Sequence, residues 1–190
     1  MDTILFHICC APCANQCIDS LLEEGLNVTG YWFNPNIHPF TEYRSRRNTL
    51  REYAEQIGMK LIEDDIYGLR PFVQEVAEDI SGRCKYCYQV RMDWTAKKAV
   101  EQGFDGFSTS LLISPYQNHE GIILAAEEAS KKYGVPFIYR DFRPLFQKGQ
   151  ERARELGFYM QKYCGCIFSE EDRYLNKKKQ NRAEALRRTL

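Results

Sequence analysis

Short apolar runs rich in β-branched and aromatic residues alternate with amphipathic stretches along the chain, and this alternation most limits the fold that it can adopt. The apolar runs predict strands at residues 3–8, 27–34, 59–63, 104–113 and 135–139. The stretches between them predict helices at residues 12–24, 41–56, 70–79, 120–133 and over a segment ending at Gln102. Because parallel strands are joined through helices, we expect an α/β fold, a parallel sheet with helices on both faces.

The chain shows no repeat, low-complexity segment or linker, so residues 1–190 are expected to form a single α/β domain. Its C-terminal part, from about residue 149 to residue 190, is expected to be helical and packed on that domain, with an interruption at YCGCIFSEED (163–172). In parallel sheets, functional groups gather at the carboxyl ends of the strands. The predicted strands place five candidates there: Cys9, Cys10, Asn34, Ser110 and Asp141.

Composition narrows the class of protein. No apolar run is long enough to cross a bilayer, and the N-terminal stretch lacks the features of a signal peptide, so we expect a cytoplasmic protein without a membrane partner. Lys and Arg (26) balance Asp and Glu (26). This balance argues against strong nonspecific binding of nucleic acid, but a local basic patch remains compatible with it.

Eight cysteines fall into three groups, at 9–17, 84–87 and 164–166. In a reducing compartment such groups favour metal or redox chemistry over disulfides. The C-C, C-x-x-C and C-x-C pairs predict six metal ligands: Cys9, Cys10, Cys84, Cys87, Cys164 and Cys166. Cys17 lies on the apolar stripe of its predicted helix and is expected to be a packing residue.

Cys13 is a seventh candidate thiol and is predicted to be a catalytic residue. Pro12 suits the first position of a helix and places Cys13 in the first turn, where the helix dipole favours a thiolate. Seven thiols exceed the four ligands of a structural zinc site and favour a [4Fe–4S] cluster with a second metal nearby. Alternatively, CAPC is a thioredoxin-like redox pair, although a dithiol oxidoreductase does not need the other cysteines.

The sequence resembles the QueH-type, non-cobalamin epoxyqueuosine reductases. The matching stretches occur in the family's order over nearly the whole chain: HICCAPC, NPNIHP, GRCKYCYQVRM, STSLLISPYQNHE, RDFR and KYCGCIFSEED. The combination of CCAPC with YCGCxFS is specific to this family. It differs from the glycine-rich phosphate loop of ATP pyrophosphatases, so ATP is not expected as a cofactor.

The resemblance implies a fold like that of the adenine-nucleotide α-hydrolases and a [4Fe–4S] cluster beside an additional mononuclear iron. It also implies reductive removal of the epoxide oxygen of epoxyqueuosine in a tRNA anticodon loop, which gives queuosine. This reaction takes two electrons and two protons, so an external electron donor is expected as a partner. An iron with an open coordination position would act on the epoxide oxygen as a Lewis acid.

Further residues are candidates for the site. Asp141 follows the last predicted strand and is expected to bind the lone iron or deliver protons; alternatively it caps a helix or pairs with a flanking arginine. Arg91 lies one helical turn beyond Cys87 and is expected to face the cluster or the substrate. His119 and Asn34 follow predicted strands and are candidate substrate-binding residues.

RNA binding needs cations and stacking surfaces. Residues 44–51 include Arg46 and Arg47, and residues 173–190 carry seven Lys or Arg against one Glu. Either segment alone is equally typical of a solvated helix face. Four aromatic residues offer faces for loop bases, although most of them are expected to belong to the core: Tyr31, Trp32, Phe33 and Tyr43.

Two other functions compete with the reductase. A cluster-dependent tRNA thiolation enzyme of the same superfamily would need ATP and its phosphate loop, which this sequence lacks. A zinc-stapled, non-catalytic RNA-binding module would be colourless after anaerobic purification, whereas a protein with an iron–sulfur cluster would be brown.

Overall fold

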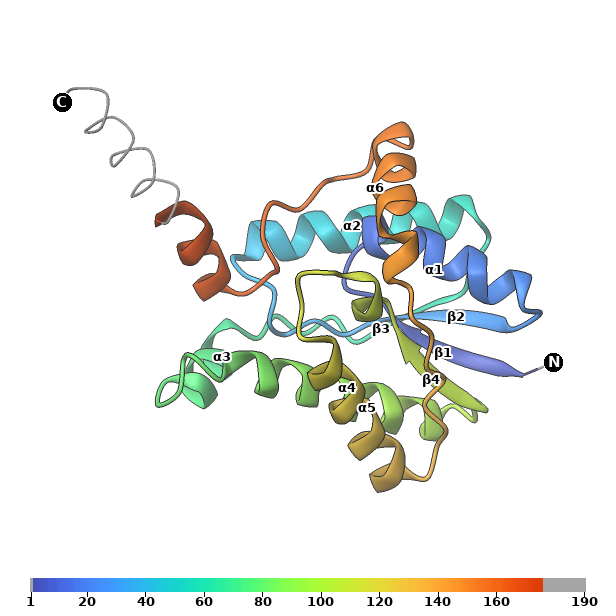
Figure 1. Cartoon of the computed structure of the whole chain (residues 1–190), viewed down its shortest axis with the longest axis horizontal. Helices are drawn as coiled ribbons and strands as arrows, with labels where there is room; N and C mark the ends of the chain where they lie inside the picture. The colour runs from blue at the N-terminus through green and yellow to red at the C-terminus, as the bar shows by residue number, and fades with distance from the viewer. Residues whose placement is uncertain (1, 176–190) are drawn as a thin grey trace.

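The computed structural model describes residues 2–175 and contains a four-stranded parallel sheet in the order β3-β2-β1-β4 (Figure 1). Its strands are β1 (Thr3–His7), β2 (Asn27–Trp32), β3 (Leu61–Glu63) and β4 (Gly106–Thr109). All four run in the same direction, so their carboxyl ends share one edge of the sheet.

Helices cover both faces of the sheet, as predicted. One face carries α1 (Ala11–Glu23), α2 (Phe40–Gln56) and α6 (Phe146–Glu155), and α6 packs on α1 (Figure 1). The other face carries α4 (Arg83–Glu101) and α5 (His119–Tyr133), with α3 (Leu69–Val76) next to the start of α4. This arrangement confirms the α/β class.

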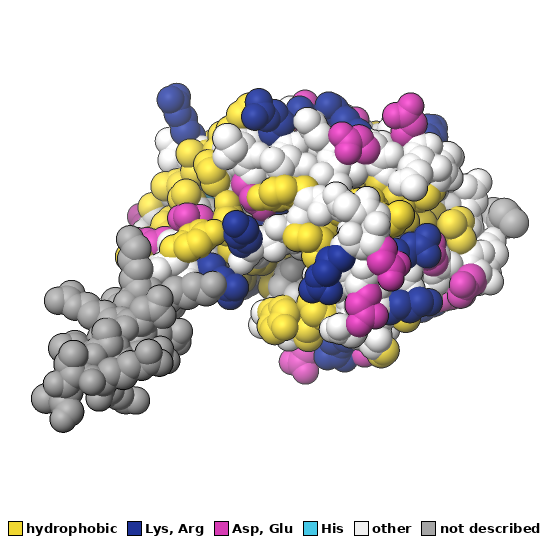
Figure 2. Space-filling view, turned by 90° about the horizontal axis from the view of Figure 1, so that it is seen from above, with side chains coloured by type: hydrophobic (Ala, Val, Ile, Leu, Met, Phe, Trp, Pro, Cys, Tyr) yellow, Lys and Arg dark blue, Asp and Glu magenta, His cyan; other side chains and the backbone are white. Residues whose placement is uncertain are grey.

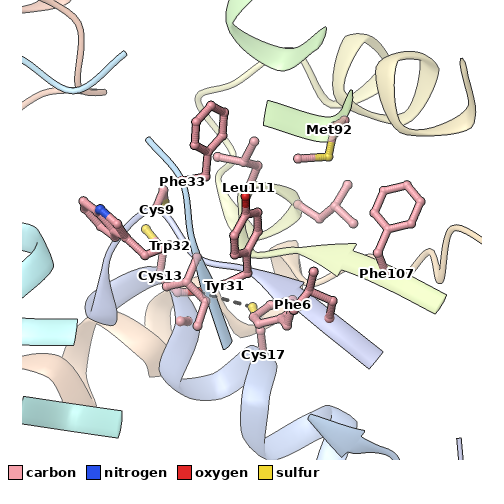
Figure 3. Close-up of a cluster of buried hydrophobic side chains, with 14 of the residues drawn as sticks. Phe6, Cys9, Cys13, Cys17, Tyr31, Trp32, Phe33, Met92, Phe107 and Leu111 are labelled. Carbon is pink, nitrogen blue, oxygen red and sulfur yellow. Dashed lines mark hydrogen bonds between the residues drawn. The ribbon is translucent and has the colours of Figure 1, made fainter. Parts of the chain in front are cut away.

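The central strands are buried on both faces because helices lie on each side. Phe6 of β1, Tyr31 of β2 and Phe107 of β4 are fully buried, and Figure 3 shows them in one apolar cluster that also includes Met92 and Leu111. Strands buried on both faces are apolar almost throughout, so the apolar sequence runs of β1 and β2 predict these strands directly.

Two predicted strands differ from the structure. The run 104–113 forms a strand only up to Thr109, and Ser110–Ile113 form a 3₁₀ helix, η1, in which the Thr109 side chain accepts a hydrogen bond from the Leu111 N–H at 3.2 Å. The predicted strand 135–139 was wrong, since it contributes only an isolated bridge between Phe107 and Phe137. Pro136 has no N–H to donate, so the ladder does not extend through it.

The C-terminal part is largely helical in the described range. The 3₁₀ helix η2 (Arg143–Leu145) leads into α6, residues 156–166 contain no regular helix or strand, and residues 167–175 are helical. Most of the predicted basic segment 173–190 lies outside the described residues. Within residues 2–175, no helix has both the length and the apolar character that a membrane span requires.

Candidate metal centre

Three cysteines converge where β1 leads into α1. Cys9, Cys10 and Cys13 have sulfur atoms that all lie within 4.8 Å of one another, and all three residues are buried. Cys10 is the N-cap of α1 and Pro12 lies in its first turn, as the sequence predicted. All eight cysteines of the chain are free thiols. We call Cys9, Cys10 and Cys13 the cysteine triad.

Polar side chains from distant segments contact the triad. Ser110, the first residue of η1, accepts a hydrogen bond from the Cys9 N–H at 3.2 Å, and its hydroxyl lies 3.6 Å from the Cys9 sulfur. The side-chain amide of Gln161 donates to the Cys13 sulfur at 3.3 Å. Gln161 was not predicted from the sequence, because it lies in a segment without periodicity or motif. The triad is therefore enclosed by α1, η1 and the segment after α6.

The acidities of the three thiols depend on one another. Hydrogen bonds from the Cys10 and Cys13 thiols hold the pKa of Cys9 well below its ordinary value. The pKa of Cys13 is raised because its thiol donates to Cys10 and Cys9, and burial adds to the rise. Hydrogen bonds thus couple the acidities of the triad thiols. The thiolate expected at Cys13 stays a prediction.

Four of the five remaining cysteines form a second group, and Cys17 lies apart from it. Cys84 and Cys87 lie in the first turns of α4, and Cys164 and Cys166 lie in the segment after α6. Cys87 and Cys166 are buried together in a small apolar cluster with Phe72, whereas Cys84 and Cys164 are exposed. Burial raises the pKa of Cys87 to about 12, and the neighbouring Cys164, Cys166 and Cys84 add to the rise. Cysteines 80 residues apart are therefore neighbours.

The C-x-C segment is fixed on the loop before α2. The Gly165 carbonyl accepts from the His38 N–H at 2.8 Å, and the Tyr163 hydroxyl donates to the His38 carbonyl at 2.7 Å. The packing is tight at Gly165, where a Cβ atom would lie 3.3 Å from Cγ1 of Ile37. The glycine between the two cysteines thus permits close approach to this loop.

Arg46 holds the same segment from α2, which contradicts its predicted contact with RNA. Its side chain is only 2% exposed. The guanidinium bonds Glu42 Oε1 at 2.7 Å and donates to the carbonyls of Tyr163 and Cys164 at 3.0 and 2.9 Å. A buried guanidinium that is fully engaged in this way has no surface to offer a nucleic acid. Arg47, which was also predicted to bind substrate, is paired with Asp65.

Arg91 occupies the expected place, one turn beyond Cys87 on α4. Its Nε donates to the Cys87 carbonyl at 2.9 Å, and its Nη2 donates to the Cys87 sulfur at 3.0 Å. The side chain is 2% exposed. The prediction that Arg91 lies toward the cysteine site agrees with these contacts.

The remaining predicted site residues have other partners. Asn34 is buried and donates to the Ile8 carbonyl at 2.9 Å, so it holds the chain just before Cys9. His119 contacts the Tyr139 hydroxyl at 3.2 Å. Both carboxylate oxygens of Asp141 bind the Arg143 guanidinium, at 2.8 and 2.7 Å. None of the described hydrogen bonds joins His119 or Asp141 to a cysteine.

The aromatic residues predicted to stack on RNA bases belong to the core. All four are buried, which agrees with the core alternative and leaves no face for stacking: Tyr31, Trp32, Phe33 and Tyr43. Burial and a hydrogen bond to Asp64 raise the pKa of the Tyr31 hydroxyl, as expected for a hydroxyl in the core. An exposed aromatic residue lies elsewhere: Tyr116, in the loop after η1, is 85% exposed.

The thiol geometry fits metal binding. Two sulfurs bound to one tetrahedral metal ion at about 2.3 Å lie about 3.8 Å apart. The sulfurs of Cys9 and Cys10 are separated by 3.8 Å. Within residues 2–175, the triad is the one group of cysteine, histidine or acidic side chains compact enough for a single ion. The four cysteines of the second group are spaced more widely.

The chain resembles known proteins over most of its length. Residues 4–172 match the protein-family model described as epoxyqueuosine reductase QueH. A protein of that name from Dehalococcoides mccartyi is 37% identical over 171 residues, which cover 90% of this chain and 94% of the relative. Another from Thermotoga maritima is 34% identical over 181 residues, covering 89% of this chain and 91% of the relative.

A solved structure shares the fold. It is described as a predicted subunit of tRNA methyltransferase from Methanocaldococcus jannaschii, and it matches with a TM-score of 0.53 at 13% identity, over 94% of this chain and 88% of that chain. A likeness at this identity concerns the fold alone. Together with the sheet order, it confirms the expected fold class, a parallel α/β architecture.

Proposed function

The chain belongs to the epoxyqueuosine reductase QueH family, and we propose that it reduces epoxyqueuosine in tRNA to queuosine at a metal centre held by its cysteines. It is thus an oxidoreductase of queuosine biosynthesis. The observation that carries the proposal for the site is the buried triad of Cys9, Cys10 and Cys13 at the carboxyl edge of the sheet, beside a second group of four cysteines. This edge is where parallel sheets present their functional groups.

We propose a division of the thiols between two centres. The compact triad suits a single iron, because its sulfur spacing is that of ligands sharing one ion and a tetrahedral ion then has one position left. The cysteines of a [4Fe–4S] cluster bind different iron atoms, so the wider group suits such a cluster. This group consists of Cys84, Cys87, Cys164 and Cys166. When bound, these groups supply the electrons for removal of the epoxide oxygen, and an external donor replenishes them.

The protein's own residues have defined tasks in this proposal. Ser110 and Gln161 contact triad sulfurs and hold them in place. Cys13 becomes a metal ligand in addition to its predicted catalytic role. Asp141 is not required as a ligand of the lone iron when three thiols already converge, and the pairing of its carboxylate with Arg143 favours a structural role.

The tRNA partner requires an accessible surface near this edge. Lys and Arg side chains are mixed with acidic and apolar ones on the face in Figure 2, without a continuous basic stripe. We place the RNA contact at the loop after η1, which follows the carboxyl end of β4. There the exposed Tyr116 packs edge-on against Phe146, with ring centroids 5.7 Å apart, and His119 lies close to Tyr139. Exposed aromatic side chains stack on the unpaired bases of RNA loops.

The function is tested with anaerobically reconstituted protein, a chemical reductant and tRNA that contains epoxyqueuosine, followed by mass analysis of nucleosides. We expect wild type to form queuosine and Cys9→Ser to form none. The matched control is Cys17→Ser, because Cys17 is also buried, on the helix α1 that follows Cys9, but lies outside the triad. Formation of queuosine by Cys9→Ser would contradict the proposed site. Failure of the iron-loaded wild type to form queuosine would contradict the proposed function.

The RNA surface is tested separately by binding. Tyr116→Ala is expected to weaken binding of the substrate tRNA by roughly 10-fold, the value of one lost stacking contact. Arg47→Gln serves as the comparison, because Arg47 is engaged with Asp65. If the two substitutions weakened tRNA binding equally, the proposed RNA surface at the loop after η1 would be contradicted.

A further inference from the structure

Arg91 differs from the other arginine buried at the cysteine site. Arg46 is 2% exposed and is paired with the buried carboxylate of Glu42. Arg91 is also 2% exposed, but no acidic side chain among the described residues forms an ion pair with it. The described hydrogen bonds of its guanidinium go to the carbonyl and the sulfur of one residue, Cys87.

A buried cation without an anionic partner is costly, because it loses its hydration and gains no opposite charge. Arginine cannot escape this cost by releasing its proton. The protein therefore needs a nearby negative charge that its acidic side chains do not supply. The Tyr88 ring, with its centroid 5.9 Å from the Arg91 Cζ, offers a cation–π contact but stays neutral because burial raises its pKa. The remaining groups around the guanidinium that can become negative are thiols.

Arg91 contacts the second group of cysteines directly. The Cys87 sulfur, which accepts from its Nη2 at 3.0 Å, belongs to a residue that is buried in one cluster with Cys166. Arg91 is therefore a permanent cation where the C-x-x-C pair and the C-x-C pair meet.

We propose that Arg91 is the built-in counter-charge of the metal-bound thiolates and the positioning residue for the sulfur of Cys87. The inference rests on the proposed function only in that the cysteines bind a metal. Metal binding requires deprotonated thiols, so the loaded site is anionic and matches the guanidinium, whereas the site with neutral thiols does not.

This role predicts opposite effects of one substitution in two forms of the protein. Arg91→Met replaces the cation by an apolar chain of similar length. In the metal-free protein, the unpaired charge disappears, so the melting temperature is expected to stay the same or rise. In the metal-loaded protein, the thiolates lose their counter-charge, so the melting temperature is expected to fall by several degrees.

Arg91→Lys separates charge from geometry. Lysine keeps the positive charge but lacks the planar fork that bonds both the carbonyl and the sulfur of Cys87. We expect most of the metal-loaded melting temperature to be retained in Arg91→Lys. The proposal would be overturned if Arg91→Met lowered the melting temperature equally in both forms, or if it failed to fold without metal. Either result would show that Arg91 is only a packing residue.

The reduction potential of the iron-loaded protein is a second readout. A nearby cation and an N–H···S bond both stabilise the more negative, reduced form. Arg91→Gln is therefore expected to shift the midpoint potential to a more negative value, and Arg91→Lys to stay close to wild type. Lys132→Gln is the matched control, since it removes one charge from an exposed ion pair with Asp93. A potential of Arg91→Gln equal to that of wild type would contradict the counter-charge role.

These measurements need bound metal but no epoxyqueuosine. If wild type binds iron and shows the expected shifts but does not form queuosine, the proposed function fails and the inference on Arg91 stands. If it forms queuosine and Arg91→Gln leaves both the potential and the stability unchanged, the function stands and the inference fails. Metal analysis of wild type identifies the remaining case, in which no metal binds and both fail.

Discussion

Cys17 and Cys87 are both buried thiols on helices, but their surroundings differ. The Cys17 sulfur lies among the apolar side chains of the central cluster and donates to the carbonyl of Cys13 at 3.3 Å (Figure 3). Burial raises its pKa well above the ordinary value, so it remains a neutral thiol. Cys87 lies beside Arg91 and three other cysteines. Burial alone therefore does not distinguish a packing cysteine from a ligand.

We predict that Cys17→Ala lowers the free energy of unfolding by about 1–2 kcal/mol, because it leaves a small cavity in the core. Its iron content should equal that of wild type. Cys87→Ala should lose most of its iron. Urea denaturation and metal analysis measure both quantities. A folded Cys17→Ala protein without iron would show that Cys17 is a ligand.

Asp141 provides a second test at this scale. Its hydrogen bonds to Arg143 lower the pKa of the carboxyl to about 2, so its stabilising contribution is present above about pH 4 and is lost as the pH falls toward 2. The side chain is 37% exposed, which limits the contribution to less than about 1 kcal/mol. We expect Asp141→Asn to lose this small acid dependence and to retain its iron. Loss of about one iron per chain would instead support the ligand role predicted from the sequence.

At the scale of elements, the segment with Cys164 and Cys166 depends on contacts from other parts of the chain. It has no regular secondary structure of its own and is held by α2 and by the loop before α2. The ring of His38 belongs to this contact: Nδ1 accepts from the Ile167 N–H at 3.3 Å, and Nε2 lies 3.0 Å from the Pro35 carbonyl. A second proton on the His38 ring would leave Nδ1 unable to accept the hydrogen bond from the Ile167 N–H.

The metal-free protein should accordingly lose stability in mild acid. Burial lowers the pKa of His38 to about 4. An unfolded histidine binds its proton near about pH 6.5, so between these two values the unfolded state takes up more protons and acid favours unfolding. We expect the free energy of unfolding of wild type to fall between pH 6.5 and 4, and His38→Gln to show a weaker fall. Identical pH profiles in denaturant titrations would contradict this assignment.

At the scale of the whole molecule, the metal site joins segments that are distant in the sequence. The triad follows β1, the C-x-x-C pair begins α4, and the C-x-C pair follows α6. A metal centre bound by all three segments would cross-link the fold and would be lost when the protein unfolds.

We predict that anaerobic reconstitution loads about four irons plus roughly one more per chain. Loading should raise the melting temperature, because the metals bind the folded state only. Metal analysis and thermal scans of the loaded and metal-free forms measure these effects. Stoichiometric zinc with almost no iron would instead favour a zinc-stapled module.

The organisation of residues 1–190 as one domain remains a prediction. One sheet and one main apolar cluster link elements from β1 to α6 in the described part of the chain. We expect calorimetry of the metal-free protein to show a single cooperative transition whose calorimetric and van't Hoff enthalpies agree. Two separate transitions would contradict a single domain.

Local patterns in the sequence determined the class of fold and the chemical elements of the site. The apolar runs of β1 and β2 and the helical spacing of their neighbours predicted the α/β layers, because periodicity depends only on adjacent residues. The paired spacing of the cysteines, such as Cys84 and Cys87, likewise predicted metal ligands before any contact was known. The family motifs extended this prediction to the reaction.

Tertiary structure alone decided which residues are buried and which cysteines are neighbours. Arg46 and Tyr31 were compatible with an RNA surface until the packing of α2 and the sheet enclosed them. The grouping of Cys13 with Cys9 and Cys10, and the isolation of Arg91 from acidic side chains, depend on segments that meet only after folding. Burial, hydrogen-bond partners and charge balance are properties of neighbours in space, and residue type and spacing along the chain do not specify those neighbours.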